Sequence, residues 1–181
     1  VGVLASVFVA LLLFELNSRN ATKIFQTLLI TPHFMSWVIV AYMVYAILNP
    51  SYGYLNQILA MFGQEKIDWY SKPNAWPWIL VITNTWKNVG MDSVVYYAAL
   101  MGVDVALFEA AEVDGANKLQ RNWHIVLPSI VPLIVMLTIL KIGSIFRADF
   151  GLFYSVTQDG ANGNLFKTTN VIDTYIFRTF R

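Results

Sequence analysis

The sequence contains no cysteine and few charged residues. Without cysteine it carries neither a disulfide framework nor a thiolate metal site. Charged residues make up 13% of the 181 residues and hydrophobic residues 57%, whereas soluble domains usually contain about 25% and about 45–50%. No Asp, Glu, Lys or Arg occurs from Ile24 to Gln64, and a membrane-spanning helix needs about 20 predominantly apolar residues. These proportions predict a membrane protein.

The motifs of several chemistries are also missing. The sequence has no G-x-x-x-x-G-K-S/T phosphate-binding loop, so we expect no ATP site on this chain. It has no G-x-S-x-G or H-E-x-x-H motif, and Glu109 and Glu112 lie in a short loop without a cavity, so we expect no enzyme activity. His33 and His124 lack metal-ligand spacing, and we expect no metal site. The net charge of +1, with no basic stripe, argues against a nucleic-acid partner.

What the sequence does have is long apolar segments. They cover residues 1–16, 24–48, 75–101 and 125–146. As a helix, the last would be about 33 Å long, enough for a hydrocarbon core of about 30 Å. We therefore expect an all-α fold, that of a polytopic helical membrane protein. The chain opens in mid-run on Val1, with no Met and no basic leader, so we expect an internal piece of a longer protein with a truncated first helix.

The connecting segments differ in charge. By alternation, residues 17–23 and 104–124 lie on one side of the membrane and residues 49–74 on the other. The first side has four basic residues and the second has two: Arg19, Lys23, Lys118 and Arg121 against Lys66 and Lys72. Because cytoplasmic loops are enriched in basic residues, this count favours a cytoplasmic position for 104–124. Within 49–74, the apolar patch Leu55–Phe62 is expected to form a small helix at the surface.

The most informative stretch is residues 109–128. It reads Glu-Ala-Ala-Glu-Val-Asp-Gly-Ala and, after eight residues, Ile-Val-Leu-Pro. The first four residues are good helix formers, and Asp114-Gly115 is a stop signal because glycine tolerates a positive φ. We therefore predict a short helix over Val105–Val113 followed by a sharp turn. Pro128 falls in the first turn of the next helix, where proline is tolerated.

These residues resemble the cytoplasmic coupling loop of ATP-binding-cassette (ABC) importer permeases, and within that family the carbohydrate-importer branch for polysaccharides and oligosaccharides. The similarity covers nearly the whole chain. Four further segments resemble the family's R-T-x-x-x-x-P, N-P-x-x-G-x-x-N, W-K-x-x-G and D-T-Y-I-Y-R patterns: Gln26–Pro32, Asn49–Asn56, Trp86–Gly90 and Val171–Ile176. Gln26 replaces the usual Arg, and Phe177 the second Tyr. The resemblance implies a type I permease fold with about four of its six spans, the first and last being absent.

The resemblance further implies a transport subunit and not an enzyme. Residues 1–181 would belong to a single permease domain in the cytoplasmic membrane, with 104–124 as the coupling loop. The domain would form half of the path for a sugar or oligosaccharide, beside a second permease subunit, the same or related. Separate ATPase subunits would hold ATP and Mg²⁺, and an extracytoplasmic solute-binding protein would deliver the substrate. The residues expected to couple to the ATPase are Glu109, Ala110, Ala111, Asp114, Gly115, Ala116, Leu127 and Pro128.

Polar residues interrupt the third apolar segment. Asn84, Asn88 and Asp92 follow one another at a spacing of four residues and form one stripe on a helix, with Lys87 beside it. Because a charge inside a bilayer costs about 2.5–3.5 kcal/mol or more, such residues face a bundle interior or an aqueous path. They either line a substrate path, binding sugar hydroxyls, or fix helix packing. Lys141 is expected to reach the membrane surface, and Tyr96 and Tyr97 to be packing or interface residues.

Two alternatives in function remain open at this point. The substrate of an ABC permease could be a polyol or phosphosugar instead of a saccharide. The chain could instead be an ion-coupled secondary carrier with Lys87 and Asp92 as its coupling pair. Dependence on ATP hydrolysis by a second subunit separates the carrier from the permease.

Overall fold

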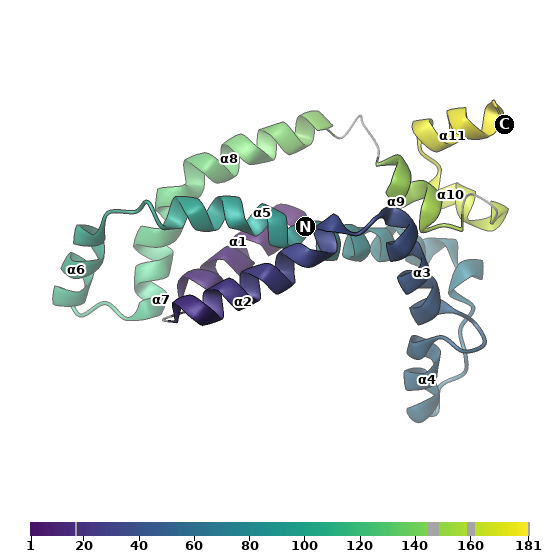
Figure 1. Ribbon diagram of the computed structural model, residues 1–181, viewed down its shortest axis with the longest axis horizontal. Coiled ribbons are helices and arrows are strands. Elements are labelled where there is room, and N and C mark those ends of the chain that lie inside the picture. The colour runs from purple at the N-terminus through teal and green to yellow at the C-terminus, as the bar shows by residue number, and fades with distance from the viewer. Residues whose placement is uncertain (17, 145–148, 159–161, 181) are drawn as a thin grey trace. The chain divides into compact units, whose positions relative to one another are not determined.

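The protein is helical in the computed structural model, which describes residues 1–16, 18–144, 149–158 and 162–180 (Figure 1). No strand occurs within these ranges, so the all-α prediction is confirmed. The α-helices are α1 (Gly2–Phe14), α2 (Arg19–Ile30), α3 (Trp37–Leu48), α4 (Tyr54–Met61), α5 (Trp76–Leu100), α6 (Val105–Val113), α7 (Lys118–Arg121), α8 (Leu127–Gly143), α9 (Phe150–Ser155), α10 (Phe166–Thr169) and α11 (Ile172–Thr179).

The chain forms two compact units. Unit 1 comprises Val1–Phe34 and Thr85–Ile145, and unit 2 comprises Met35–Asn84 and Phe146–Arg181. Helix α5 therefore contributes its N-terminal part to unit 2 and its C-terminal part to unit 1. That the two units make up one permease domain stays a prediction.

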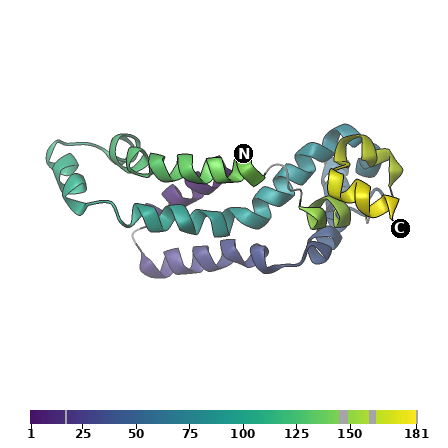
Figure 2. The same ribbon diagram turned by 90° about the horizontal axis from the view of Figure 1, so that it is seen from above.

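The apolar core of unit 1 lies between α1, α5 and the start of α8. Its buried side chains are Val7, Ala10, Tyr96, Leu100, Val126 and Ile130. Figure 2 shows α1, α2 and the C-terminal part of α5 lying alongside one another. Tyr96 is 1% exposed, and Tyr97 packs against the same core. The expectation that these tyrosines are packing residues is confirmed.

Helices α2 and α5 touch through their main chains at Gly90. A Cβ atom on Gly90 would lie 1.9 Å from the carbonyl oxygen of Leu29 and 2.8 Å from the amide nitrogen of Ile30. Only glycine leaves room for such an approach, as is common where membrane helices pack closely. This contact gives a physical reason for the glycine of the W-K-x-x-G segment.

The apolar segment 24–48 is not one continuous helix, contrary to what its hydrophobicity suggested. Helix α2 ends at Ile30, a 3-10 turn covers Thr31–Phe34, and α3 begins at Trp37. Thr31 is still helical, but Pro32 has no N–H to donate to the preceding turn, so one helical hydrogen bond is missing where α2 ends. The Ser36 hydroxyl then caps α3 by accepting a hydrogen bond from the amide of Ile39 at 3.3 Å.

The third and fourth apolar segments form helices at the expected places. Helix α5 ends within one residue of each predicted boundary, and α8 is preceded by α7 and a π-helical turn over Asn122–Val126. The predicted end of the fourth segment, at 146, lies outside the described residues. By length and composition, the described part of the chain has one helical run able to cross a membrane, Lys118–Gly143, or up to three if two interrupted helix pairs count as one span each.

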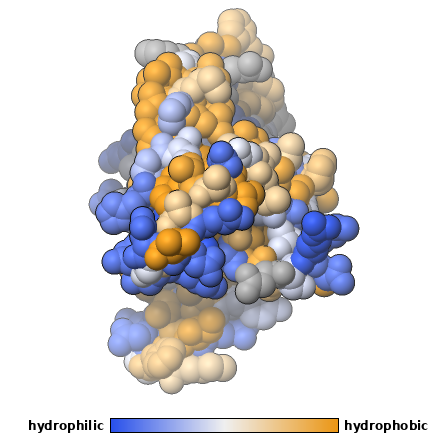
Figure 3. Space-filling model, turned by 90° about the vertical axis from the view of Figure 1, so that its left-hand side faces the viewer, coloured by the Kyte–Doolittle hydropathy of each residue, from blue (hydrophilic) through white to orange (hydrophobic). Residues whose placement is uncertain are grey.

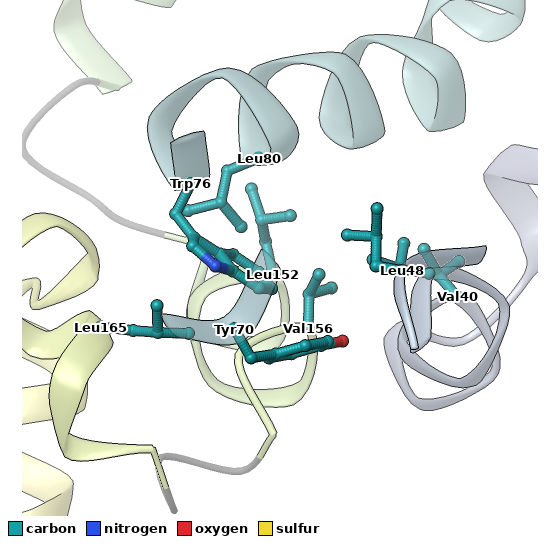
Figure 4. Close-up of a cluster of buried hydrophobic side chains, with 9 residues drawn as sticks. Val40, Leu48, Tyr70, Trp76, Leu80, Leu152, Val156 and Leu165 are labelled. Atoms are coloured by element: carbon teal, nitrogen blue, oxygen red, sulfur yellow. The ribbon is translucent and has the colours of Figure 1, made fainter. Parts of the chain in front are cut away.

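The core of unit 2 is rich in aromatic and aliphatic side chains. Figure 4 shows Trp76, Leu80, Leu152 and Val156 pointing toward one another, with the Tyr70 ring beside them. The indole of Trp76 is fully buried and donates its N–H to the carbonyl of Trp69 at 3.0 Å. Burial raises the pKa of the Tyr70 hydroxyl above its usual value.

The turn that resembles N-P-x-x-G-x-x-N is held by side-chain amides. The Asn56 amide donates to the carbonyls of Asn49, Pro50 and Ile67 at 3.3, 3.2 and 2.9 Å, and its oxygen accepts from the amide of Ile67. A Cβ atom on Gly53 would lie 2.4 Å from the Asn49 carbonyl oxygen. The residues of this pattern therefore fix the turn that leads into α4. Helix α4 (Tyr54–Met61) corresponds to the small helix expected over Leu55–Phe62.

Candidate coupling site

Helix α6 begins and ends where the sequence predicts, at Val105 and Val113. Its first turn is capped by Asp104, whose carboxylate accepts a hydrogen bond from the amide of Ala106 at 3.0 Å. Such a cap satisfies an amide that has no partner within the helix. Both ends of α6 are set by residues close in sequence, so its shape is determined locally.

The C-terminal end of α6 is a Schellman motif. The amide of Ala116 donates to the carbonyl of Ala111 at 2.9 Å, and the amide of Gly115 donates to that of Glu112 at 3.0 Å. This arrangement places Gly115 at φ +73°, in the left-handed region that favours glycine. The Asp-Gly-Ala sequence is thus explained by the turn that it forms.

The candidate coupling residues differ in their access to a partner. Glu109, Ala110 and Glu112 are exposed on α6, and Val113 at its end is 87% exposed. Ala111 is only 8% exposed and faces the interior of unit 1, so of the two alanines only Ala110 is open to another protein. Figure 3 is viewed from the side on which α6 and α7 lie in Figure 1, and hydrophilic and hydrophobic surface lie side by side there.

The chain returns to the membrane helix through α7. Asn117 and Gln120 form a reciprocal capping box, with hydrogen bonds of 2.8 and 2.9 Å. Leu127 packs against the core of unit 1, and Pro128 lies exposed in the first turn of α8, as expected. Beside the Gly115 turn lies a hollow of about 300 Å³, lined by Asp114, Gly115, Ala116, Gln120, Arg121, His124 and Ile125.

The structure adds a residue that the sequence did not reveal, Glu15. Its carboxylate accepts hydrogen bonds from Asn122 at 2.8 Å and Arg121 at 3.3 Å, and lies 3.6 Å from the ammonium of Lys118. Glu15 caps the C-terminal end of α1, whereas its partners belong to α7 and the π-helical turn. Because 106 and 107 residues separate it from Arg121 and Asn122, no local pattern signals the contact.

Of the four candidate pathway residues, three bind other parts of unit 1. Lys87 is 6% exposed and donates to the carbonyl of His33 at 2.6 Å and to that of Pro32 at 3.4 Å. The Asn88 amide oxygen lies 3.0 Å from Nδ1 of His33. Asp92 forms an ion pair with Lys141 of α8. These contacts favour a role in helix packing for the three residues.

Asn84, the fourth, lies in unit 2 and is exposed. It lines a hollow of about 360 Å³ together with residues of α5, α9 and α10, among them Leu152 and Thr168. The four residues therefore do not share one environment, although they share one face of α5.

The structure also shows the contacts of Lys141 and of the two histidines, His33 and His124. The ammonium of Lys141 is paired with Asp92, and its position at the membrane surface stays a prediction. Nδ1 of His33 lies 3.0 Å from the amide oxygen of Asn88, and Nδ1 of His124 lies 3.0 Å from the carbonyl oxygen of Gln120, so both histidines are hydrogen-bonded. Among the described residues, no cluster of His, Cys, Asp or Glu has the arrangement of a metal site.

Replacing Lys87 by methionine is expected to destabilise unit 1. The two carbonyls that Lys87 binds at the broken end of α2 would lose a buried donor, which typically costs about 1–3 kcal/mol. The control is Lys66→Met, because exposed Lys66 also donates to a carbonyl, that of Ser51 at 3.2 Å. In thermal unfolding in detergent, Lys87→Met should have a lower midpoint than the wild type, and Lys66→Met should not. A Lys87→Met midpoint equal to that of the wild type would contradict the packing role.

These elements define the class of protein: a helical membrane subunit with a short, rigid helix held between two apolar helices. The family model of the binding-protein-dependent transport system inner membrane component matches residues 2–178, and the chain belongs to that family. The family description names a binding-protein-dependent transport system, which favours the permease over the ion-coupled carrier considered above.

Curated relatives agree with this assignment. The chain is 36% identical over 171 residues to the polygalacturonan/rhamnogalacturonan transport system permease protein YteP of Bacillus subtilis, covering 94% of this chain and 52% of the relative. It is 32% identical to protein LplB of the same organism, covering 96% and 53%. It is 30% identical to the sn-glycerol-3-phosphate transport system permease protein UgpA of Escherichia coli O157:H7, covering 88% and 53%. The chain thus spans about half the length of these relatives.

Two solved structures share the fold. One is a bacterial ABC transporter involved in the import of the acidic polysaccharide alginate, with a TM-score of 0.89 and 36% identity over 97% of this chain and 60% of that chain. The other is the bacterial alginate ABC transporter in complex with an alginate pentasaccharide-bound periplasmic protein, with a TM-score of 0.89 and 37% identity over 98% and 60%. The type I permease fold implied by the resemblance is confirmed.

Proposed function

We propose that this protein is the membrane-spanning permease subunit of an ABC importer and forms half of the translocation path for an oligosaccharide. The observation that carries the proposal is α6. It is a short helix with a fixed cap at each end, exposed acidic and small residues, and a position in the chain between α5 and α8. A rigid, exposed helix of this kind is suited to transmit displacement and not to perform chemistry.

In this function, α6 is the contact for an ATPase subunit that holds ATP and Mg²⁺. Glu109, Ala110 and the Gly115 turn form the contact surface. An ATPase that binds one arrangement of α6 more tightly than another shifts the permease toward that arrangement. Movement of α6 is passed to α5, which precedes it, and through α7 to α8, and alternates access to the path between the two sides of the membrane. The loop 104–124 then lies on the cytoplasmic side of the cytoplasmic membrane.

The substrate class follows from the relatives. The names of YteP and of both alginate transporters point to acidic polysaccharide fragments, which favours an acidic oligosaccharide here. A periplasmic protein carrying an alginate pentasaccharide accompanies one of those transporters, so we infer an extracytoplasmic solute-binding protein as a partner. The name of UgpA, an sn-glycerol-3-phosphate transport system permease protein, supports a phosphorylated polyol as the second candidate substrate.

Co-purification tests the coupling proposal. The full-length protein is expressed in membranes with candidate ATPase subunits and compared with a Glu109→Lys, Gly115→Asp double variant. Capture of an ATPase by the wild type and not by the variant supports the contact at α6. Equal capture by both would contradict it.

Uptake separates the substrates. Uptake is measured in vesicles that contain the assembled importer and its binding protein. The substrate offered is trigalacturonate, maltotriose or sn-glycerol 3-phosphate, each with and without ATP. If trigalacturonate is taken up in an ATP-dependent way and the other two compounds are not, the result supports an acidic oligosaccharide as the substrate. Preference for either of the others would overturn that choice and leave the coupling proposal standing.

A further inference from the structure

The end of α1 is joined to α7 by a group of polar contacts, which we call the Glu15 junction: Glu15, Lys118, Arg121 and Asn122. The Glu15 carboxylate bonds to Asn122 at 2.8 Å and Arg121 at 3.3 Å, with Lys118 at 3.6 Å. A charged hydrogen bond of this kind is stronger than a neutral one. The junction therefore fixes where the segment following α6 sits against α1.

The partners of Glu15 contribute unequally. The side chain of Glu15 is 24% exposed and that of Arg121 29%, whereas that of Lys118 is 67% exposed. Ion pairs open to water are screened and contribute little. The bonds to Arg121 and Asn122 are thus the ones that hold the junction, and Lys118 adds mainly charge at its edge.

Arg121 extends the junction to α6. Its guanidinium lies 5.4 Å from the centre of the Phe108 ring, within the range of a cation–π contact. The Phe108 ring in turn lies 5.9 Å from the ring of Phe14, the last residue of α1. Phe108 is three residues before the buried Ala111 and shares its inward face of α6. Helix α6 is therefore attached to α1 both through these rings and through Arg121.

We propose that Glu15 is a positioning residue that makes α1 follow the coupling helix. Helices α5 and α8 are linked to α6 by short connections in the chain, but α1 is not. The Glu15 junction supplies that link at the end of α1 nearest α6. A displacement of α6 is thereby passed to α1 as well as to its chain neighbours. This inference rests on the proposed coupling function of α6.

The test measures coupling in the complete importer. The full-length protein is reconstituted with its ATPase and binding protein, and uptake of whichever of trigalacturonate, maltotriose and sn-glycerol 3-phosphate the wild type transports best is measured per ATP hydrolysed. Glu15→Gln keeps the length of the side chain but removes the charge that binds Arg121. We expect this ratio to fall about fivefold or more, the size of a typical coupling energy, while ATPase capture is unchanged. Glu65→Gln, in an exposed loop of unit 2, is the matched control and should keep the wild-type ratio.

A cross-link provides an independent test that does not depend on charge. This sequence has no cysteine, and in a full-length protein whose other cysteines, if any, are replaced by serine, Glu15→Cys with Asn122→Cys can be joined by a short thiol-specific reagent. Before cross-linking, the double variant should transport less substrate per ATP hydrolysed than the wild type. After cross-linking, this ratio should return to the wild-type value. If Glu15→Gln does not fold, this pair decides the question.

The outcomes separate the two proposals. No ATPase capture by the wild type would contradict the coupling function itself. A wild type that captures ATPase and transports, beside a Glu15→Gln variant with the same ratio, would overturn the junction alone. A cross-linked variant that stays uncoupled would overturn it as well.

Discussion

Replacing Gly115 by aspartate is expected to abolish most transport without unfolding the protein. Gly115 has a φ of +73°, and a Cβ atom placed there would meet nothing within 4 Å. The substitution therefore causes no clash, but a side chain in the left-handed region costs up to about 1–2 kcal/mol, and Asp and Asn pay less of this than other residues. Strain of up to that size lowers the population of the native turn by up to about 5–30-fold.

The charge of the new side chain adds to this effect. Gly115 follows Asp114 at the C-terminal end of α6, where a negative charge is unfavourable by about 0.3–1 kcal/mol. Asparagine has nearly the same shape, tolerates the left-handed region and carries no charge. ATP-dependent uptake should therefore fall in the order Gly115, Gly115→Asn, Gly115→Asp. Both variants should elute as folded protein in size-exclusion chromatography, and normal uptake by Gly115→Asp would remove the support for the coupling loop.

Replacing Gly90 by alanine is expected to have the largest effect on stability. The added Cβ would lie 1.9 and 2.2 Å from the carbonyl oxygen and carbon of Leu29. These are main-chain atoms of a helix and cannot rotate away, so α2 and α5 must separate. Overpacking of this kind typically costs about 1–3 kcal/mol and occasionally more. Lys87 and Asn88 of α5 bind His33, which follows α2, and separation of the two helices would break these contacts as well.

Gly143→Ala is the matched control for this prediction. Gly143 is also a helical glycine, at the end of α8, but a Cβ atom there meets nothing within 4 Å. Alanine favours a helix over glycine by about 0.5–1 kcal/mol, so the control should be neutral or slightly stabilised. The thermal midpoint of purified protein in detergent is the measurement. A Gly90→Ala variant as stable as wild type would mean that the two helices do not pack through their main chains.

The boundaries of α6 could be predicted because the signals that set them are local. Asp104 caps the helix two residues from its bonding partner, and Gly115 ends it through bonds to the preceding turn. The break after α2 was also encoded locally, by Pro32 and Ser36. There the continuous hydrophobicity of the segment suggested a single helix, although hydrophobicity reports burial or lipid contact and not helix continuity.

The partners of the polar residues in α5 could not be predicted. Asn88 bonds to a residue 55 positions away, and Asp92 pairs with one 49 positions away. The four-residue spacing showed that these side chains share a face, but not what lies opposite that face. The sequence therefore left path lining and packing open, and the contacts of Lys87, Asn88 and Asp92 favour packing.

The separation in sequence between Glu15 and its partners bears on the order of folding. Helix α6 can take its shape as soon as Asp104 to Ala116 are synthesised, since its caps are local. The Glu15 junction closes a loop of 106 residues, so it can form only after the chain has been synthesised as far as its partners in α7 and the following turn. During synthesis α6 can thus take its shape before it can be anchored to α1. An ATPase that binds the anchored helix more tightly than the free one would select permeases whose membrane helices are already assembled.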